Sequence, residues 1–328
     1  MRTVAYVFPG QGSQSVGMGR ALAAGSPAAA AVFAAADVAL GEPISSLAWE
    51  GPEELLNLTE NAQPALLATS IAYLAALRER LSGPDAAAAG EEATAMLRPR
   101  FVAGHSMGQY SALVAAEVVS LADGLRLVRE RGTRMQASGA GREGAMAAIL
   151  GLPDEAIAEL VARASTHGTF NVANRNAPGQ VVVSGERPAI EAAAEIAREL
   201  GARRAIVLPV SVAAHSPLMA EAAAAMRAVL ADVAFSDPTV PLLANADARV
   251  LATGEACRAE LVEHLTTGVD WVRAVETMTV AGVDTFIEVG PGKVLTNLIK
   301  RIAPDAAAIA LDEPTAPDGL ALPSAVPA

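Results

Sequence analysis

Cysteine, aromatic residues and charged residues are all scarce in this chain. The single cysteine, Cys257, excludes an internal disulfide framework and any metal site built from several cysteines. Aromatic residues are 3% of the 328 residues, so we expect an aliphatic core and no aromatic platform for stacking single-stranded nucleic acid. Charged residues are 18% and hydrophobic residues 52%, a balance that excludes a disordered chain. The chain is long and apolar enough to bury a sizeable core.

Long apolar runs and an excess of positive charge are also lacking. No stretch of about 18 apolar residues runs without interruption, so a transmembrane helix is not expected. Residues 1–8 lack the pattern of a signal peptide. Lys and Arg total 24 against 36 Asp and Glu, and this net charge of −12 disfavours binding to a polyanion. We therefore expect a cytoplasmic protein that binds neither nucleic acid nor a membrane.

The pattern of apolar residues predicts an α/β protein. Short apolar runs at 4–8 and 101–103 lead into turns that contain glycine, as buried strands do. Helical patterns follow each of them, and the alternation resumes with a strand at 285–289. The predicted helices of these regions lie at 19–40, 52–58, 63–78, 107–119, 120–136, near 216–231 and at 269–280.

The middle of the chain has a different order of elements, β-α-β-β-α-β, which is that of the ferredoxin-like split βαβ unit. We expect such a subdomain at 143–209, inserted into a larger domain of residues 1–142 and 210–313. Residues 82–98 are expected to form a surface excursion and residues 314–328 a flexible C-terminal tail. The predicted elements of the subdomain are strands at 145–149, 170–173, 180–184 and 204–208 and helices at 153–164 and 188–200.

The sharpest local motif is Gly104-His105-Ser106-Met107-Gly108. It fits the G-x-S-x-G nucleophile elbow and has the context that this motif requires, an apolar strand before it and a helix after it. The helix N-terminus then points amide donors toward a developing oxyanion. This motif predicts a hydrolase-like core around a parallel sheet, and chemistry that is either acyl transfer or hydrolysis.

A serine nucleophile needs a base, and the chain has four histidines. The side chain of His105 should diverge from that of its neighbour Ser106, and His167 lies in a polar loop. His215 follows a predicted strand and precedes a helix, where the active sites of α/β proteins assemble. His215 is therefore the favoured base.

Seven ordered blocks resemble the malonyl-CoA:acyl carrier protein transacylases and the related acyltransferases of polyketide synthases. The resemblance extends from residue 3 to about residue 313 and is weakest at 82–98. The blocks are Phe8-Pro9-Gly10-Gln11-Gly12-Ser13-Gln14, Gln63-Pro64-Ala65, the serine elbow, Arg131-Gly132 with Met135-Gln136, residues 174–180, Val210-Ser211 with His215-Ser216-Pro217, and Glu288-Val289-Gly290-Pro291-Gly292.

The resemblance implies a ping-pong acyl transfer. Ser106 would take the acyl group from a CoA thioester and pass it to the phosphopantetheine thiol of a carrier protein, with His215 moving the protons. The backbone amides of Gln11 and Met107 would form the oxyanion hole. Gln63 and Asn176 would be polar residues of the substrate pocket.

Substrate choice would depend on Arg131. The predicted helix at 120–136 also carries Arg126, Arg129 and Arg134, and periodicity does not distinguish among them. The family pattern Arg-Gly-x-x-Met-Gln selects Arg131. A guanidinium pairs with a carboxylate through two hydrogen bonds, so this residue implies a malonyl-type acyl donor.

Three positions depart from the family pattern. Gln109 stands where the family usually has Glu. Ala214 precedes the active-site histidine where many malonyl-specific relatives have Phe and methylmalonyl-specific ones Ser, so an acyl group branched at its α-carbon could fit. His264 stands where Gln or Asn usually orients the catalytic histidine through its backbone carbonyl. Because no aspartate is identifiable as a third member, we expect a dyad of serine and histidine.

The expected partners are an acyl carrier protein and malonyl-CoA or a related acyl-CoA, with no tightly bound cofactor and no metal. Carrier proteins are acidic, so we expect a local basic docking surface, with Arg203, Arg204, Lys300 and Arg301 as candidates. Three alternatives stay open: a free-standing polyketide acyltransferase that uses an alkylmalonyl or carrier-bound donor, an α/β-hydrolase-type thioesterase, and a catalytically silent docking module.

Overall fold

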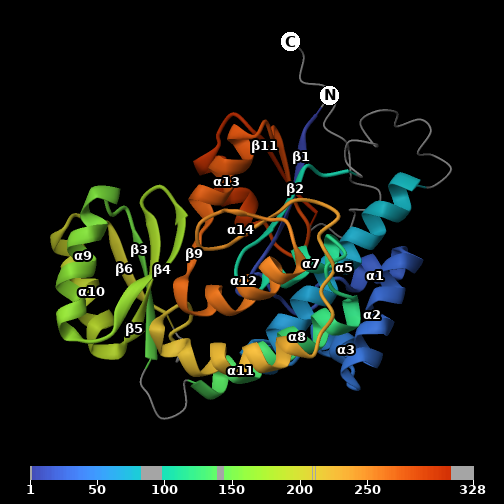
Figure 1. The fold of residues 1–328 in the computed structure, drawn as a ribbon, viewed down its shortest axis with the longest axis horizontal. Helices are drawn as coiled ribbons and strands as arrows, with labels where there is room; N and C mark the ends of the chain where they lie inside the picture. Colours follow the sequence, from blue (N-terminus) through green and yellow to red (C-terminus); the bar gives the residue numbers. More distant parts are fainter. Residues whose placement is uncertain (1, 83–97, 139–143, 209, 211, 312–328) are drawn as a thin grey trace.

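A computed structural model describes residues 2–82, 98–138, 144–208, 210 and 212–311. The surface excursion expected at 82–98, apart from its two end residues, and the tail expected at 314–328 lie outside these ranges. The described residues form two sheets with helices packed around them (Figure 1).

A six-stranded sheet forms the centre of the larger body, in the order β11-β10-β1-β2-β7-β8. Its pairs are parallel except for the antiparallel pair of β7 and β8. The α/β fold with a parallel sheet is therefore confirmed. The strands are β1 (Val4–Phe8), β2 (Phe101–Gly104), β7 (Leu242–Leu243), β8 (Val250–Leu251), β10 (Thr285–Glu288) and β11 (Ala307–Ala310).

Both faces of this sheet are covered, which explains why β1 is apolar at every position. Val4, Tyr6 and Phe8 belong to one buried apolar cluster, whereas Ala5 and Val7 belong to another. The covering helices are α1 (Arg20–Gly25), α2 (Pro27–Leu40), α3 (Ile44–Glu50), α4 (Glu53–Leu56), α5 (Thr59–Ser82), α7 (Gly108–Ala115), α8 (Leu121–Ser138), α11 (Ala220–Ala231), α12 (Gly254–Thr267), α13 (Trp271–Val280) and α14 (Val294–Ile302).

The helix predicted at 19–40 is two helices. Ser26 has an extended backbone, and its side chain accepts a hydrogen bond from the N–H of Ala29 at 3.1 Å, so it caps α2. Pro27 occupies the first turn of α2, where its missing N–H costs nothing. The Ser-Pro pair therefore ends α1 and begins α2.

Two helices of the C-terminal third, α12 and α14, were not predicted. The inner face of α12 buries Glu260 and His264 beside its apolar residues, which weakens the apolar periodicity. The first turn of α14 is capped from the preceding strand β10, because the carboxylate of Glu288 accepts hydrogen bonds from the N–H groups of Leu295 and Thr296. This capping residue lies farther before the helix than the N-cap position that usually signals a helix start.

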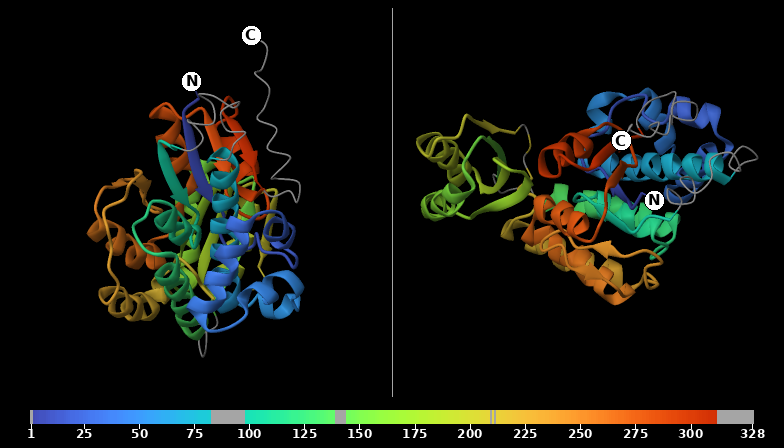
Figure 2. Two further views of the ribbon diagram at one scale, coloured as in Figure 1. Left: turned by 90° about the vertical axis from the view of Figure 1, so that its right-hand side faces the viewer. Right: turned by 90° about the horizontal axis from the view of Figure 1, so that it is seen from above.

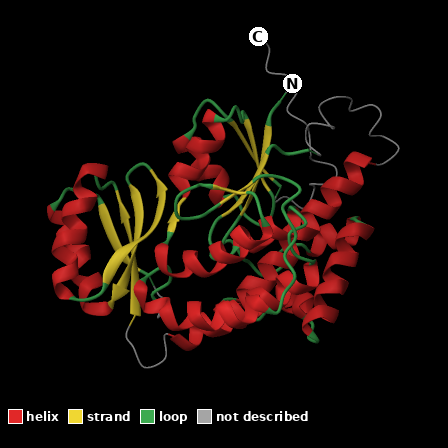
Figure 3. Ribbon diagram, in the orientation of Figure 1, coloured by secondary structure: helices red, strands yellow, loops and turns green. Residues whose placement is uncertain are grey.

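A smaller sheet stands beside the larger body and is covered on one side by two helices (Figures 1 and 3). Its strand order is β6-β3-β5-β4-β9, and the first four strands pair antiparallel, as in a split βαβ unit. The elements are β3 (Gly144–Leu150), α9 (Ile157–Ala164), β4 (Phe170–Ala177), β5 (Gln180–Glu186), α10 (Arg187–Glu199), β6 (Arg204–Val207) and β9 (Val269–Asp270).

The fifth strand of this sheet comes from a distant part of the chain. β9 pairs parallel with β4, in the register Asn174 to Val269 and Arg175 to Asp270. The ferredoxin-like unit expected at 143–209 is thus extended by a strand that lies outside it. The right-hand view of Figure 2 shows the smaller sheet with its helices at one side of the larger body; we call these two parts the smaller and the larger lobe.

Candidate active site

Ser106 lies on a sharp turn between β2 and α7. Its φ of 55° is in the left-handed region, which is strained for a residue with a side chain. A Cβ at Gly104 would lie 2.0 Å from the backbone carbon of Gly108, and one at Gly108 would lie 2.1 Å from the carbonyl oxygen of Phe8. Both glycines of the elbow are therefore required by close backbone packing.

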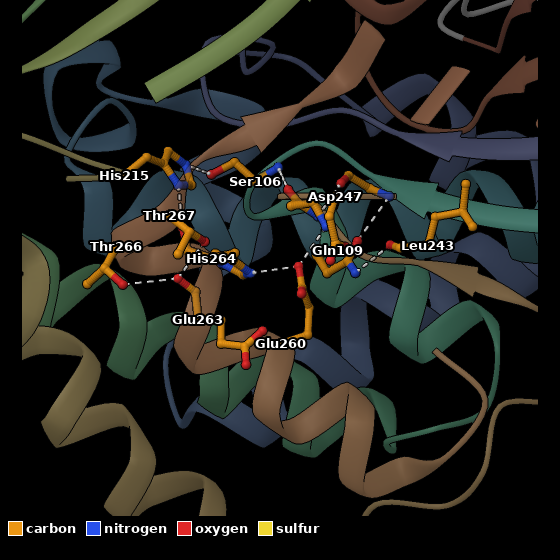
Figure 4. A network of polar contacts seen from close by, with 12 residues as sticks. Ser106, Gln109, His215, Leu243, Asp247, Glu260, Glu263, His264, Thr266 and Thr267 are labelled. Atoms are coloured by element: carbon orange, nitrogen blue, oxygen red, sulfur yellow. Dashed lines mark hydrogen bonds and ion pairs between the residues drawn. The ribbon is translucent and has the colours of Figure 1, made fainter. Parts of the chain in front are cut away.

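Ser106 and His215 form a hydrogen-bonded pair. The Oγ atom of Ser106 lies 2.7 Å from Nε2 of His215, and Nδ1 of His215 lies 2.6 Å from the carbonyl oxygen of His264 (Figure 4). Because a carbonyl oxygen only accepts, Nδ1 carries the proton and Nε2 is free to accept the serine proton. The pair therefore has the geometry of a nucleophile and its base.

The imidazole of His215 is held neutral. Burial lowers its pKa to about 3, and the nearby positive charge of Arg131 acts in the same direction. A neutral imidazole at physiological pH is the form that can act as a general base.

The backbone of His215 is also strained, with a φ of 58°. The side chain of Asn171, on β4, donates a hydrogen bond to its carbonyl oxygen at 2.6 Å. Next along the chain, the hydroxyl of Ser216 donates to the carbonyl oxygen of Ala213 at 2.7 Å. These contacts fix the loop that presents His215, and no local sequence signal predicts the contact with Asn171.

Asn245, in the loop that follows β7, is hydrogen-bonded to the backbone of the serine elbow. Its Oδ1 atom accepts from the N–H of Ser106 at 2.8 Å, and its Nδ2 donates to the carbonyl oxygen of Gly104 at 3.0 Å. Its own N–H donates to Glu260 at 2.6 Å. Sequence reasoning missed this residue, although it lies at the carboxyl end of β7, where functional side chains gather in α/β sheets.

The side chain of Gln109 is buried beneath the elbow. Its Oε1 accepts from the N–H of Gly104 at 3.3 Å, and its Nε2 donates to the carbonyl oxygen of Leu243 at 2.9 Å. An amide serves both contacts, whereas an ionised carboxylate could only accept. The departure from Glu at this position is therefore compatible with an ordered elbow.

Arg131 is buried, with 1% of its surface exposed, and its guanidinium reaches the nucleophile. Nη2 donates to Oγ of Ser106 at 3.1 Å, and Nη1 donates to Oε1 of Gln63 at 2.8 Å. Within the described part of the chain Arg131 forms no ion pair, and its Nε atom has no hydrogen-bond partner. Burial lowers the pKa of this guanidinium, which means that its charge is poorly solvated. The arrangement can bind an anion beside Ser106.

The two backbone amides of the predicted oxyanion hole belong to the elbow and to the loop that packs against it. Met107 is buried at the N-terminal end of α7. The loop that holds Gln11 packs against the elbow, because a Cβ at Gly10 would lie 2.6 Å from the carbonyl oxygen of His105. Among the described residues, the N–H groups of Gln11 and Met107 donate to no backbone or side-chain acceptor. They are available to a ligand.

Two further predicted positions lie around the elbow. Nε2 of His105 lies 2.9 Å from Oδ1 of Asn176, and its ring meets that of Trp271 edge-on at 5.7 Å, so the side chain of His105 diverges from Ser106 as expected. Asn176 is therefore engaged with His105. Ala214 is half-buried against the main apolar cluster.

Comparison with known proteins identifies the family. Residues 5–310 match the family described as "Acyl transferase domain". The chain belongs to the acyl transferase domain family. The malonyl CoA-acyl carrier protein transacylase of Escherichia coli K12 is 44% identical over 316 residues, which are 96% of this chain and 98% of that protein.

Solved structures of acyltransferases have the same fold as this one. The acyl-carrier-protein S-malonyltransferase of Bartonella henselae has a TM-score of 0.89 at 42% identity and covers 96% of this chain and 97% of its own. A malonyl-transacylase in complex with a type II polyketide synthase acyl carrier protein has a TM-score of 0.87 at 39% identity, over 96% and 98% of the two chains.

The four basic residues predicted to dock a carrier protein lie where β6 and α14 meet the turn between β4 and β5. We call this region the basic seam. Arg203 and Arg204 are exposed at the start of β6, and Lys300 and Arg301 are exposed near the end of α14. Arg301 donates to the carbonyl oxygen of Pro178 at 2.7 Å, in the turn between β4 and β5. That turn is joined to Gly151 by a backbone hydrogen bond from Gly151 to Gly179, and Arg203 packs on Gly151. The fold therefore brings together two pairs that are distant in sequence.

The described part of the acyltransferase has neither a cluster of metal-ligating side chains nor a membrane-spanning helix. No group of three or more histidine, cysteine, aspartate or glutamate side chains in the described ranges could hold a metal ion. No helix of the described chain is both long and apolar enough to cross a bilayer.

Proposed function

We propose that this chain transfers a malonyl group from CoA to an acyl carrier protein through an acyl-enzyme on Ser106. The observation that carries this proposal is the buried guanidinium of Arg131, which has no ion-pair partner among the described residues and lies 3.1 Å from Oγ of Ser106. The names of the relatives, malonyl CoA-acyl carrier protein transacylase among them, support the same activity.

In the first half-reaction the nucleophile is the hydroxyl of Ser106. Its oxygen attacks the thioester carbonyl while Nε2 of His215, 2.7 Å away, takes the hydroxyl proton. The carbonyl of His264 stabilises the resulting imidazolium through Nδ1. The backbone N–H groups of Gln11 and Met107 bind the oxyanion. The intermediate then collapses to the serine ester, and His215 returns the proton to the departing CoA thiolate.

The second half-reaction reverses these steps with a different thiol. His215 takes the proton of the carrier protein's phosphopantetheine thiol, whose sulfur attacks the ester carbonyl. The C–O bond to Ser106 breaks, and His215 gives the proton back to the serine oxygen. The acyl carrier product is a building block for fatty-acid or polyketide synthesis.

Specificity for malonyl over acetyl follows from the buried charge of Arg131, which has no ion-pair partner among the described residues. A malonyl carboxylate can pair with the guanidinium in a site with little water, where the pairing is strong. An acetyl group leaves the buried charge without a partner. Gln63 keeps the guanidinium in place without neutralising it, since an amide oxygen accepts a hydrogen bond but carries no charge.

Two alternatives make different predictions. In a thioesterase, water would replace the carrier thiol in the second half-reaction. In a polyketide acyltransferase with an alkylmalonyl donor, the branch at the α-carbon would lie beside the small side chain of Ala214. A role in polyketide synthesis is favoured by the solved structure of one relative in complex with a polyketide synthase acyl carrier protein.

The carrier protein would dock at the basic seam formed by Arg203, Arg204, Lys300 and Arg301. Acidic carrier proteins are attracted to a positive surface, and this seam is a confined positive region on a chain with a net charge of −12. We also place the reaction in the cytoplasm, with CoA as a substrate carrier and no tightly bound cofactor.

Intact-mass measurement of the Ser106 adduct tests the proposal. The protein is exposed to acetyl-, malonyl-, methylmalonyl- and ethylmalonyl-CoA, and holo carrier protein is then added. We expect a malonyl adduct that moves to the carrier protein, and Arg131→Ala should lose the dicarboxylic adducts selectively. Hydrolysis of the adduct without transfer would favour the thioesterase.

A further inference from the structure

The imidazole of His264 is a buried polar group that the reaction above does not use. Its backbone carbonyl is hydrogen-bonded to His215, and its side chain, fully buried on α12, lies between the ring of His215, at 5.9 Å between centroids, and Arg131. Nε2 of His264 lies 3.4 Å from Nη2 of Arg131. A guanidinium nitrogen only donates, so Nε2 must be the unprotonated nitrogen that accepts.

The tautomer of His264 is consistent with what surrounds its other nitrogen. With Nε2 unprotonated, Nδ1 carries the proton; it has no hydrogen-bond partner among the described residues, and Oε1 of Glu260 lies 4.0 Å from it (Figure 4). Burial, followed by the charge of Arg131, holds the pKa of His264 well below its ordinary value. The ring is therefore a neutral acceptor that faces a cation on one side and a carboxylate on the other.

Arg131 thus lies between two neutral acceptors. Oε1 of Gln63 takes a hydrogen bond from Nη1, and Nε2 of His264 takes one from Nη2. The ring of Tyr110 lies 5.9 Å from the guanidinium carbon. Neutral acceptors fix the plane of the guanidinium and leave its full charge for a ligand, which an aspartate or glutamate in either place would neutralise.

We propose that the imidazole of His264 is a positioning residue that determines acyl specificity, because it aims the guanidinium of Arg131 at the carboxylate of the acyl group. This inference rests on the proposed malonyl transfer. It concerns the side chain of His264 alone, and the backbone contact with His215 is independent of it.

Two amide variants separate the side-chain role from the backbone role. The amide of Gln reaches about as far as Nε2 of histidine, so His264→Gln can keep an acceptor for Arg131. The amide of Asn is one carbon shorter and reaches only as far as Nδ1, so His264→Asn keeps polarity and the backbone carbonyl but loses this acceptor.

The test is the loading of Ser106 from malonyl-CoA and from acetyl-CoA in the wild type and both variants. A hydrogen bond to a charged group implies a loss of about tenfold or more in kcat/KM for malonyl-CoA in His264→Asn, mostly through KM. The ratio of kcat/KM for malonyl-CoA to kcat/KM for acetyl-CoA should therefore fall in His264→Asn, whereas His264→Gln should retain this ratio.

Three results would overturn the inference. One is an unchanged malonyl preference in His264→Asn. Another is an equal loss with both CoA thioesters, since that indicates general disturbance of the fold. The third is a loss in His264→Gln as large as that in His264→Asn. If the wild type forms no malonyl adduct, the proposed function itself fails, which is a distinct outcome.

Discussion

Oδ1 of Asn245 lies 2.8 Å from the backbone N–H of Ser106, and this hydrogen bond joins residues 139 positions apart. It gives the N–H of Ser106 a hydrogen-bond acceptor at the strained turn of the elbow, where surrounding structure must hold the unfavourable backbone conformation. Asn245 also holds Gly104, so one side chain connects the strand before the nucleophile to the nucleophile itself.

Asn245→Ala should therefore weaken both the fold and the nucleophile. We expect unfolding to become easier by about 1–3 kcal/mol, because buried backbone groups lose their partner. Ser106 should be acylated at least about tenfold more slowly. Denaturant unfolding and single-turnover loading from malonyl-CoA measure the two effects. The exposed Asn297→Ala is the matched control, and equal behaviour of the two variants would contradict the role of Asn245.

Gly104→Ala should prevent stable folding. A Cβ there would lie 2.0 Å from the backbone of Gly108, and no side chain can move to relieve the contact. Gly282→Ala is the control, since its Cβ would meet nothing within 4 Å and only its positive φ of 93° opposes the change. We expect a cost of about 1–2 kcal/mol at Gly282 and a larger one at Gly104. Thermal melting of the two variants measures this difference, and equal melting temperatures would contradict it.

The pH dependence of acylation should report the charge of Arg131. Burial and this charge both lower the pKa of His215, to about 3, so loading of the wild type from acetyl-CoA should stay constant down to about pH 5. Removing the charge and admitting water in Arg131→Ala both raise that pKa toward its ordinary value. The decrease of kcat/KM on the acid side of the pH profile should then occur at higher pH. Arg131→Lys keeps the charge and should keep the low pKa, and identical pH profiles in all three proteins would disprove the coupling.

Glu260 should make stability depend on pH. Burial raises the pKa of its carboxyl from 4.5 to about 7, so ionisation is less favourable in the folded state than in the unfolded state. The wild type should thus lose stability, relative to Glu260→Gln, as pH rises from about 5 to about 8. The variant keeps an oxygen to accept from the N–H of Asn245. Chemical denaturation across this range measures the difference, and parallel curves for both proteins would exclude the effect.

Reversal of charge at Arg203 and Arg204 should impair docking of the carrier protein. We expect KM for the carrier protein to rise by about tenfold, while loading of Ser106 from malonyl-CoA is unchanged. Reversal at Arg163 and Arg198, which are exposed on the helices α9 and α10 of the same lobe, changes the net charge equally and should leave KM unaffected. An unchanged KM in the first variant would remove these residues from the docking surface.

Local signals account for what could be predicted from the sequence. The elbow is predictable because its glycines lie two positions before and two positions after Ser106, and His215 because it follows a strand. The hydrogen bond between Nδ1 of His215 and the carbonyl oxygen of His264 is the geometry that the family resemblance implies. Arg131 was selected by family pattern, because a helix with several arginines does not show which one is buried. Asn245 and Asn171 were missed, since each acts on a backbone group far away in the chain. The pairing of β9 with β4 is equally non-local.

The two sheets hold different members of the proposed dyad. Ser106 follows β2 of the larger sheet, whereas the loop of His215 leaves β6 of the smaller one and is held there by Asn171. The backbone of Asn245 accepts a hydrogen bond from Asp270 of β9, so the support of the nucleophile reaches the smaller sheet as well. His215 is fastened to both lobes, because its carbonyl oxygen is held by Asn171 of the smaller sheet and its Nδ1 by the carbonyl of His264 on α12 of the larger body. A rotation of one lobe against the other would have to break one of these contacts before it separated His215 from Ser106.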